Sequence, residues 1–371
     1  MNSLQFISAI PWDVWKGSGC YVATRTLITA LRQCGIQVEL IQPAIATPVY
    51  TATRLLFNES LRWRHFNSAA TIGIDVDGYA IPRTRRSPPH IACIKGVLGD
   101  AVRFEAGATR ASLAFQASLE RRHARRADLV ITVSRYCAER LEELYGVRGA
   151  VVVPELIDLT TWRELFAAHP APAIRDKFTV LSVCRFYPRK RLDILLRAAS
   201  LLRHAIPELE LRIVGNGPEY ARLQCICREL HLDSVVRWIG DASMSTLAEE
   251  YNRCDVFCLP SVQEGFGIVL LEAMAAGKPI VAARAAAIPE VVRNGMLAEP
   301  DNPEALAEAI SRLHSDSDLR RSLAMQGVQD VEGFDMHRVA GLFLAEVGRL
   351  VPILPADRTN AAEYNTTSAN A

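Results

Sequence analysis

Short apolar runs alternate with amphipathic stretches along almost the whole chain, and this alternation constrains the fold most. Residues 178–186 and 209–217 read as buried strands, and residues 191–206 between them carry apolar side chains at three- and four-residue steps, as a helix does. Repeated strand–helix alternation predicts parallel sheets with helices on both faces. We therefore expect an α/β chain of doubly wound, Rossmann-like domains, whose ligands bind at the carboxyl ends of the strands.

The length of the chain suits two such domains. Half of its 371 residues are hydrophobic, which is enough for two separate cores. We predict a first domain over residues 1–157, a second over residues 158–335, and a helix over residues 336–351 that packs back on the first domain. Residues 352–371 are small and polar, and we expect a disordered tail there.

The charge is balanced overall but not along the chain. The net charge of +1 gives no general case for a nucleic-acid partner. Residues 1–157, however, hold 19 Lys and Arg against 13 Asp and Glu, and the rest of the chain is correspondingly acidic. An excess of this kind suits contact between the first half and an anionic surface.

The nine cysteines have no disulfide-framework spacing, the first residues lack the pattern of a secretory signal, and no stretch approaches the length of a membrane span. We expect reduced thiols in a cytoplasmic protein. The pairs Cys225/Cys227 and Cys254/Cys258 have no further ligand at metal-binding spacing, so they favour buried structural thiols over a metal site.

The stretch EGFGIVLLE, residues 264–272, places two glutamates in an apolar setting, between a predicted strand and a predicted helix. Gly265 and Gly267 allow a sharp turn and a close approach to a ligand, and the amides at the start of a helix suit an anion. Glu264 should lie at the mouth of this site, and Glu272 could accept two hydrogen bonds from a vicinal diol such as a ribose. A plain strand–turn–helix fits the same spacing.

Three cations, Arg189 to Arg191, stand at the predicted start of the helix that follows residue 186. This is the unfavourable end of a helix for positive charge, and such local conflicts tend to mark functional sites. An anion such as a diphosphate, held between Arg185, Lys190 and the helix end, would remove the conflict. A solvated basic turn offset by Asp193 is the plain alternative.

Two further glycine pairs follow predicted strands. Gly215 and Gly217 stand at the end of one strand, and Gly17 and Gly19 follow the first strand of the chain. Both pairs could let a ligand approach the backbone, but a lone Gly-x-Gly is weak evidence.

Together these segments resemble the family 4 retaining glycosyltransferases, whose GT-B fold has two facing Rossmann-like domains with a deep cleft between them. The resemblance is strong over residues 178–350 and weaker over residues 1–157. It implies an acceptor-side first domain, a nucleotide-sugar-binding second domain, and transfer of a sugar from a UDP- or GDP-sugar. The acceptor would be a glycan, a lipid-linked molecule or a small molecule, with no metal and no cofactor besides the donor.

The family's signature of two glutamates separated by seven residues matches Glu264 and Glu272. The resemblance assigns the donor sugar to Glu264 and the glycine turn after it, the ribose to Glu272, the base to the border formed by Trp238 and Ile239, and the diphosphate to a basic pair. The residues so implied are Arg185, Lys190, Gly215, Gly217, Trp238, Ile239, Glu264, Gly265, Phe266, Gly267, Ile268 and Glu272.

The chemistry follows from charge. Breaking a sugar–phosphate bond leaves a nucleoside diphosphate with growing negative charge, which Arg185, Lys190 and a helix dipole could stabilise without a metal. The pair Asp75 and Asp77 in IDVDG matches a metal-binding Asp-x-Asp, but two acids at this spacing are common at strand ends. We do not expect a metal there.

One position departs from the family. Many members carry a histidine just after the strand that matches HIACIKG, where this chain has Lys95. Lys95 could bind phosphate or donor hydroxyls, and a loop lysine is the alternative. His90 precedes the expected strand, and His123 in RRHARR is expected at the surface.

The stretch RLLFNESLRWRHF, residues 54–66, mixes Leu56, Phe57 and Trp63 with Arg54 and other arginines. It could dock on the inner face of an anionic membrane, near a lipid-linked acceptor. An amphipathic helix that packs on its own domain fits equally.

Two other function classes stay open. A nucleotide-sugar 2-epimerase would share the two-domain fold but would need acid and base carboxylates in the cleft. A non-catalytic nucleotide-sugar-binding protein would bind the donor without consuming it, and the Lys95 departure is compatible with that.

Overall fold

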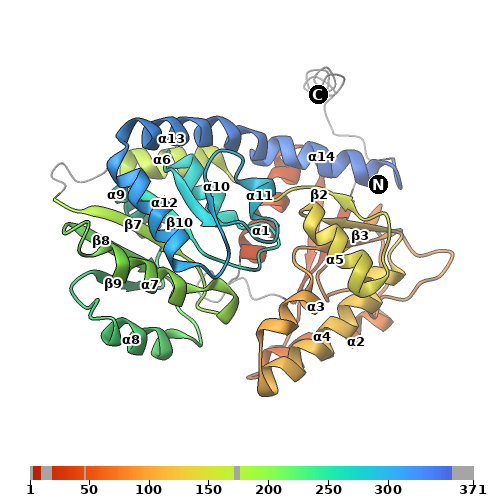
Figure 1. Ribbon diagram of the computed structural model, residues 1–371. Helices are drawn as coiled ribbons and strands as arrows, with labels where there is room; N and C mark the ends of the chain where they lie inside the picture. The colour runs from red at the N-terminus through yellow and green to blue at the C-terminus, as the bar shows by residue number, and fades with distance from the viewer. Residues whose placement is uncertain (1–2, 10–18, 46, 171–175, 353–371) are drawn as a thin grey trace. The chain divides into compact units, whose positions relative to one another are not determined.

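The computed structural model describes residues 3–9, 19–45, 47–170 and 176–352. The chain divides into two compact units, each described here by itself (Figure 1). Unit 1 comprises residues 1–156 and 336–371, and unit 2 comprises residues 157–335. Gly17 and nearly all of the predicted tail, residues 353–371, lie outside the described residues.

Unit 1 is built on a parallel sheet. In its described part the strands lie in the order β2 (Gln37–Ile41), β1 (Ser3–Ile7), β3 (Ala70–Ile74), β4 (His90–Ile94), β5 (Leu129–Thr132) and β6 (Val151–Val152). The central strands β3 and β4 are buried at every residue, as expected for a sheet covered on both faces.

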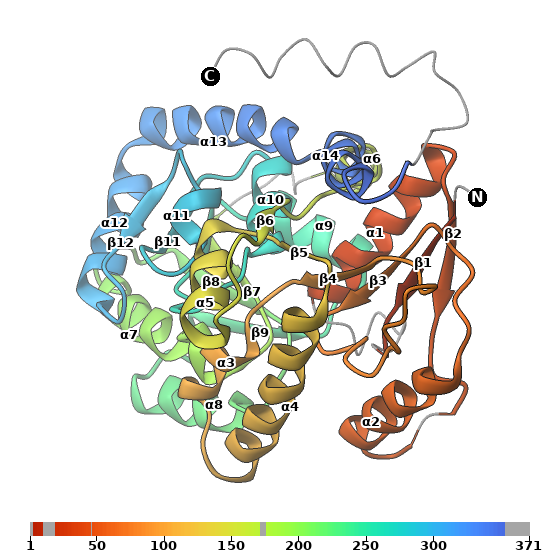
Figure 2. The same ribbon diagram turned by 90° about the vertical axis from the view of Figure 1, so that its right-hand side faces the viewer.

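The helices of unit 1 cover both faces of this sheet. They are α1 (Gly19–Gln33), α2 (Tyr50–Ser60), α3 (Leu98–Ala101), α4 (Gly107–Arg126), α5 (Arg135–Tyr145) and α14 (Met336–Gly348), with 3₁₀ turns η1 (Leu61–Trp63) and η2 (Val102–Phe104). Helix α14 packs against α1, and α3 packs against α4 and α5 (Figure 2). The rings of Phe343 on α14 and Phe6 on β1 stack at 6.2 Å.

Unit 2 repeats the plan with its own core. In its described part the strands lie in the order β12 (Met296–Ala298), β11 (Ile280–Ala283), β10 (Val256–Leu259), β7 (Phe178–Val183), β8 (Leu209–Val214) and β9 (Val236–Gly240), all parallel. The predicted parallel sheets with helices on both faces are thus present in both units.

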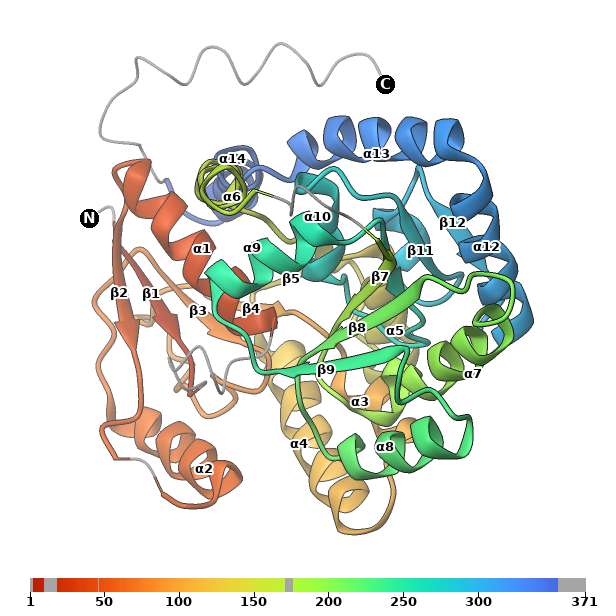
Figure 3. The same ribbon diagram turned by 90° about the vertical axis from the view of Figure 1, so that its left-hand side faces the viewer.

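The helices of unit 2 form two layers (Figure 3). One layer holds α7 (Leu192–Leu202), α8 (Tyr220–Glu229) and α12 (Pro303–Ser315); the other holds α6 (Leu159–Ala168), α9 (Met244–Arg253), α10 (Ile268–Ala275) and α13 (Ser317–Val331). The short elements are η3 (Pro188–Lys190), α11 (Ile288–Val291) and η4 (Glu332–Phe334).

Local sequence signals explain where these helices begin. Helix α12 starts after Asn302, whose side-chain oxygen accepts a hydrogen bond from the Ala305 amide at 2.8 Å, with Pro303 in the first turn. Helix α7 turns Leu192, Leu195, Leu196 and Leu202 into the core of unit 2. No helix among the described residues is long and apolar enough to span a membrane.

Each sheet reverses its strand order once. In unit 1 the chain passes from β1 to β2 on one side and then continues with β3 on the other side of β1. In unit 2 it passes from β7 to β8 and β9, and then continues with β10 on the other side of β7. In open parallel sheets, ligands bind outside the carboxyl ends of the strands at such a reversal. The topology therefore points to the loops after β7 and β10 in unit 2, and to those after β1 and β3 in unit 1.

Candidate functional site

The reversal point of unit 2 brings together the loops that contain Lys190 and Glu264. Lys190 follows β7, Glu264 follows β10, and these two strands are neighbours in the sheet. The Val262 amide donates to the Arg189 carbonyl at 2.9 Å, which ties the loops together. The Lys190 ammonium donates to the Glu264 carboxylate, and both side chains are largely buried. Two predicted site residues, 74 positions apart in the chain, thus form one ion pair.

The other cations around the start of α7 also have partners within unit 2. Arg185 pairs with Asp241 at 3.2 Å, and Arg191 pairs with Asp301 at 2.6 Å. The guanidinium of Arg189 lies 4.7 Å from the centre of the ring of Tyr187. Local partners thus offset much of this positive charge, and the binding of a diphosphate between Arg185, Lys190 and the helix start stays a prediction.

The glycines after β8 have a packing role. A Cβ atom on Gly215, whose φ is +121°, would lie 2.0 Å from the Cys184 carbonyl oxygen. A Cβ atom on Gly217 would lie 2.6 Å from the Phe186 amide nitrogen. The backbone close to these glycines belongs to the loop after β7. The absence of a side chain at both positions therefore lets the two loops pack closely and positions the segment that carries Arg185.

Helix α10 begins directly after the glycine turn. Gly267 has φ of +94°, stands at the N-cap and supplies no side chain to cap the helix. Phe266 is buried, and its ring meets that of Phe334 edge-on at 5.6 Å. The side chain of Phe266 therefore belongs to the core, which leaves the backbone around Gly265 and the helix start at Ile268 as the groups that suit an anion.

Glu272 lies in the second turn of α10, as predicted, and is 7% exposed. Its Oε2 accepts a hydrogen bond from the Tyr251 hydroxyl at 2.8 Å. Burial raises the pKa of Glu272 to about 7, although the hydrogen bond from Tyr251 opposes this shift. Tyr251 on α9 is itself fixed between the rings of Trp162 and Phe257. This partner was not predictable from the sequence, because α9 reads as an ordinary amphipathic helix.

Trp238 and Ile239 lie on β9 and point to opposite faces of the sheet, since successive strand residues alternate. The ring of Trp238 packs edge-on against Phe186 at 5.8 Å and against Tyr220 at 5.6 Å. Trp238 thus packs against the core of unit 2, and its assignment to the border of the base stays a prediction.

In unit 1, Lys95 directly follows β4. Its ammonium donates to Glu155 at 2.7 Å, and its amide donates to Asp75 at 2.8 Å. Burial alone would lower the pKa of Lys95, but the charge of Glu155, the nearby thiols of Cys93 and Cys20 and the hydrogen bond to Glu155 together hold the pKa above its ordinary value. Lys95 is therefore a buried, charged residue and not a solvated loop lysine. Gly19 is the exposed first residue of α1.

Asp77 has a structural environment. It accepts hydrogen bonds from Arg54 at 3.0 Å, from Asn58 at 2.9 Å and from the Ala9 amide at 2.7 Å. Asp75, at the reversal point of unit 1, also accepts a hydrogen bond from the Cys20 thiol at 3.2 Å. Within the described ranges, no group of three or more His, Cys, Asp or Glu residues is placed to hold a metal ion.

His123 is fully buried, so its predicted surface position is wrong. Its Nε2 lies 2.8 Å from Nε2 of His90, the first residue of β4, and its Nδ1 lies 2.5 Å from the Asp75 carbonyl. A carbonyl can only accept, so Nδ1 of His123 carries the proton and Nε2 accepts from His90. Burial lowers the pKa of His123 to about 4. Gly73 and Gly78 make room, since a Cβ atom on either would lie within 3 Å of the His123 ring.

The expected membrane helix is partly an internal element. Arg54 and Phe57 are buried, and Arg54 binds Asp77. Leu56 and Trp63 remain exposed, at 64% and 87%. Among the cysteines, Cys225 is exposed, against the prediction for that pair, and all nine are free thiols.

Two family models together match most of the chain. Residues 18–161 match the model described as Glycosyltransferase Family 4, and residues 167–330 match the model described as Glycosyl transferases group 1. These segments fall almost wholly within unit 1 and unit 2, respectively.

Curated relatives cover a smaller part. The chain is 31% identical over 238 residues to D-inositol 3-phosphate glycosyltransferase of Kribbella flavida, which covers 59% of this chain and 56% of that protein. It is 32% identical over 218 residues to the GDP-mannose-dependent alpha-(1-6)-phosphatidylinositol monomannoside mannosyltransferase of Mycolicibacterium smegmatis, over 54% of this chain and 56% of that protein. The chain thus spans about half the length of the curated relatives it matches.

Among solved structures, sucrose-phosphate synthase from Thermosynechococcus elongatus superposes with a TM-score of 0.78 at 22% identity, over 94% of this chain and 98% of that one. At this identity the likeness concerns the fold, which is of the GT-B type that the sequence predicts.

Proposed function

This chain belongs to the glycosyltransferases of group 1 and family 4, and from that premise we propose that it transfers a hexosyl group from a nucleotide-diphosphate sugar to a hydroxyl acceptor with retention of configuration. The observation that carries the proposal is the ion pair of Lys190 and Glu264 at the strand reversal of unit 2. This is the point where the topology calls for a ligand, and the pair supplies both a cation for phosphate and a carboxylate for sugar hydroxyls.

In this proposal the ion pair opens when the donor binds. Lys190 turns from Glu264 to the diphosphate, and Glu264 is left free to accept hydrogen bonds from the donor sugar. The Arg185 guanidinium makes the same exchange: it releases the Asp241 carboxylate and binds a phosphate oxygen instead. Both cations already have carboxylate partners. The exchange of partners therefore costs less free energy than the desolvation of two fully hydrated cations.

The catalytic contribution of these residues is electrostatic. When the bond between the sugar carbon and the phosphate oxygen breaks, negative charge grows on the leaving nucleoside diphosphate. Lys190, Arg185 and the amides at the start of α10 would stabilise that charge without a metal ion. Glu272, steadied by Tyr251, would accept hydrogen bonds from the two ribose hydroxyls.

For the donor we propose a GDP- or UDP-sugar, and for the acceptor a glycan, a lipid-linked molecule or a small polyol. The two curated relatives act, by their names, on an inositol phosphate and on a phosphatidylinositol mannoside, which supports testing polyol phosphates first. We place the reaction in the cytoplasm, in keeping with the free thiols. We expect no nucleic-acid partner.

The test is donor binding and turnover by the full chain. The protein is mixed with UDP-, GDP- and ADP-sugars without metal, and thermal shift and release of nucleoside diphosphate are measured, with and without an inositol phosphate. We expect one donor to stabilise the protein and to be consumed, and Lys190→Ala and Glu264→Gln to lower turnover by about a hundredfold or more. Arg228→Gln, an exposed change on α8, is the matched control.

Each other outcome favours a different function. Interconversion of the donor sugar without transfer would indicate a 2-epimerase, and binding without consumption in the presence of acceptors would indicate a binding protein. No response to any donor would contradict the proposal. Lys95→Ala separates a role in transfer from a structural role: unchanged turnover in a folded variant would remove Lys95 from the site.

A further inference from the structure

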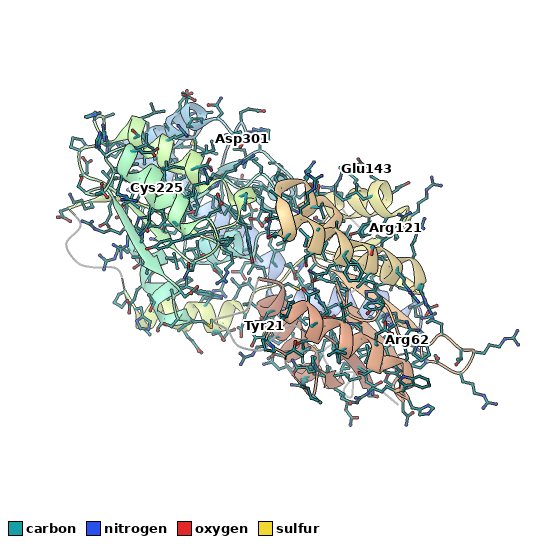
Figure 4. The ribbon with its side chains drawn as sticks, turned by 90° about the horizontal axis from the view of Figure 1, so that it is seen from below. Tyr21, Arg62, Arg121, Glu143, Cys225 and Asp301 are labelled. Atoms are coloured by element: carbon teal, nitrogen blue, oxygen red, sulfur yellow. The ribbon has the colours of Figure 1, made fainter. Side chains whose placement is uncertain are left out.

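Unit 1 carries a dense group of arginines from three separate elements. Arg62 belongs to η1, Arg83 to the loop between β3 and β4, and Arg122 and Arg126 to α4. These side chains are close enough to interact: burial, and then the charges of Arg122, Arg83 and Arg62, lower the pKa of Arg126. The arginine surface is defined here as Arg62, Arg83, Arg85, Arg86, Arg121, Arg122, Arg125 and Arg126. Figure 4 shows two of its members, Arg62 and Arg121, at the same end of unit 1.

The arginine surface lies at the amino edge of the sheet. The loop that carries Arg83 leads into β4 at His90, α4 leads into β5 at Leu129, and η1 precedes β3. All these strands are parallel, so their starts share one edge. Asp75 and Lys95 follow the ends of β3 and β4 and thus belong to the opposite edge. The arginines are therefore separate from the residues of unit 1 at the strand reversal.

Nearby carboxylates offset only part of this charge. Glu59 binds Arg62, and Asp128 binds Arg83. Seven of the eight arginines are exposed and Arg83 is half-buried. A helix C-terminus favours cations, which accounts for Arg125 and Arg126 on α4. This preference does not account for the arginines of η1 and of the loop between β3 and β4, which lie at the same edge of the sheet but belong to other elements.

A hollow extends the surface along the same edge. Its volume is about 520 Å³, and it lies between the turn from α4 to β5 and the turn from α5 to β6. Arg125, Asp128 and Arg148 line it, together with alanine, leucine, valine and glycine residues, and Arg148 also pairs with Glu142 at 3.1 Å. Its two guanidinium groups suit phosphate, which guanidinium binds with paired hydrogen bonds.

Exposed apolar side chains border the arginines. Trp63 lies between Arg62 and Arg64 in sequence and is 87% exposed, and Leu56, seven residues earlier on the same helical segment, is 64% exposed. Tryptophan favours the boundary between lipid and water, and arginine favours lipid phosphates. An exposed leucine on the same helical segment as Arg62 is stabilised in a lipid phase but makes no favourable contact with a nucleic acid. The combination favours a bilayer over a polyanion in water.

We propose that the amino edge of unit 1 docks on an anionic phospholipid bilayer, with the arginine surface at the headgroup phosphates and Trp63 at the lipid–water boundary. This differs from docking through the apolar face of residues 54–66, because Arg54 and Phe57 face the interior. The surface is distinct from the donor-binding residues, so docking and sugar transfer can be separated by experiment.

The test is co-sedimentation of the full chain with vesicles of phosphatidylcholine alone and of phosphatidylcholine mixed with phosphatidylglycerol. We expect binding only to the mixed vesicles, and release by high salt, because the attraction is screened. Each arginine near an anionic surface contributes about fivefold in affinity, so Arg122→Gln with Arg126→Gln should weaken binding roughly thirtyfold. The control pair, Arg197→Gln with Arg228→Gln on exposed helix positions of unit 2, should bind as the native chain does.

Trp63 gives a second readout. Its fluorescence should shift to the blue on mixed vesicles, and Trp63→Phe should lose that shift while keeping most of the affinity. Equal binding by the arginine pair and the control pair would overturn the proposal, as would no binding of the native chain at low salt. Binding to an oligonucleotide but not to vesicles would assign the surface to a polyanion instead. None of these readouts requires sugar transfer, so they stand whatever the donor assay gives.

Discussion

At the scale of single residues, the buried carboxyl of Glu272 sets a pH dependence. Its pKa is raised to about 7 by burial, and donor ribose would bind the ionised form. We expect the affinity for the nucleoside diphosphate to rise as the pH rises through about 7, since binding then no longer has to remove a proton. Calorimetric titration on both sides of this pH measures it. In Glu272→Gln, the affinity should depend on pH only through the ionisation of the nucleotide's own phosphates.

Ionisation of Glu272 also bears on stability. A carboxyl whose pKa is higher in the folded state than in the unfolded state contributes fully to stability at pH values below the unfolded-state pKa. That contribution is lost as the pH rises through the folded-state pKa.

Tyr251→Phe removes the hydroxyl that opposes the rise in the pKa of Glu272, so the midpoint of nucleotide affinity against pH should move to higher pH. An unchanged midpoint in this variant would mean that Tyr251 does not act through Glu272.

Replacing only one partner of the Lys95–Glu155 ion pair is expected to lower the unfolding free energy more than replacing both partners. Both side chains are almost fully buried and lie 2.7 Å apart. Glu155→Gln leaves the lysine charge without its partner, which should cost about 3–5 kcal/mol of unfolding free energy. Lys95→Met with Glu155→Met should recover most of this loss. Chemical denaturation of the single and double variants measures it, and a double variant no more stable than the single one would contradict the argument.

At the scale of elements, the loops after β7 and β8 depend on glycine. Gly215→Ala would place a Cβ atom against the Cys184 carbonyl at a positive φ, so we expect a loss of roughly 2–4 kcal/mol. Gly341→Ala is the matched control, because nothing lies within 4 Å of its Cβ position inside α14. It should stabilise the protein by about 0.5–1 kcal/mol. Equal melting temperatures for the two variants would show that the close packing is not required.

The same loops show why element boundaries were harder to predict than elements. The apolar runs predict strands over residues 178–186 and 209–217, but β7 ends at Val183 and β8 at Val214. The first run continues past its strand because Phe186 enters the core from the loop, whereas β8 is followed directly by the glycine-rich residues 215–217. Period and composition reveal strands and helices, whereas a strand end depends on which loop packs on it.

Pairings between distant residues escaped the sequence for a related reason. Local patterns indicated Lys190 and Glu264 separately, each beside a helix start, but their ion pair joins positions 74 apart. His123 reads as polar because arginines surround it in the chain, and its burial comes from His90, 33 residues away. The buried face of α4 comprises Ala117, Glu120, His123 and Ala124, and because two of these are polar the hydrophobic pattern does not mark the face.

At the scale of the whole molecule, the predicted donor residues are concentrated in unit 2, apart from Lys95, Gly17 and Gly19. A ligand that binds only the folded form stabilises it by about 2.7 kcal/mol at a hundred times its dissociation constant. We expect a nucleoside diphosphate to slow amide hydrogen exchange most strongly in the loops after β7 and β10 and in the first turn of α10. Mass spectrometry of proteolytic peptides resolves these segments from those of unit 1.

Each unit has its own sheet and core, so this protection should not spread evenly over the chain. Peptides from β1 to β6 should exchange at nearly the same rate with and without nucleotide, which makes unit 1 an internal reference in the same sample. Lys190→Ala should abolish the protection without changing exchange in unit 1. Protection confined to unit 1, or equal in both units, would contradict the assignment of the nucleotide to the strand reversal between β7 and β10.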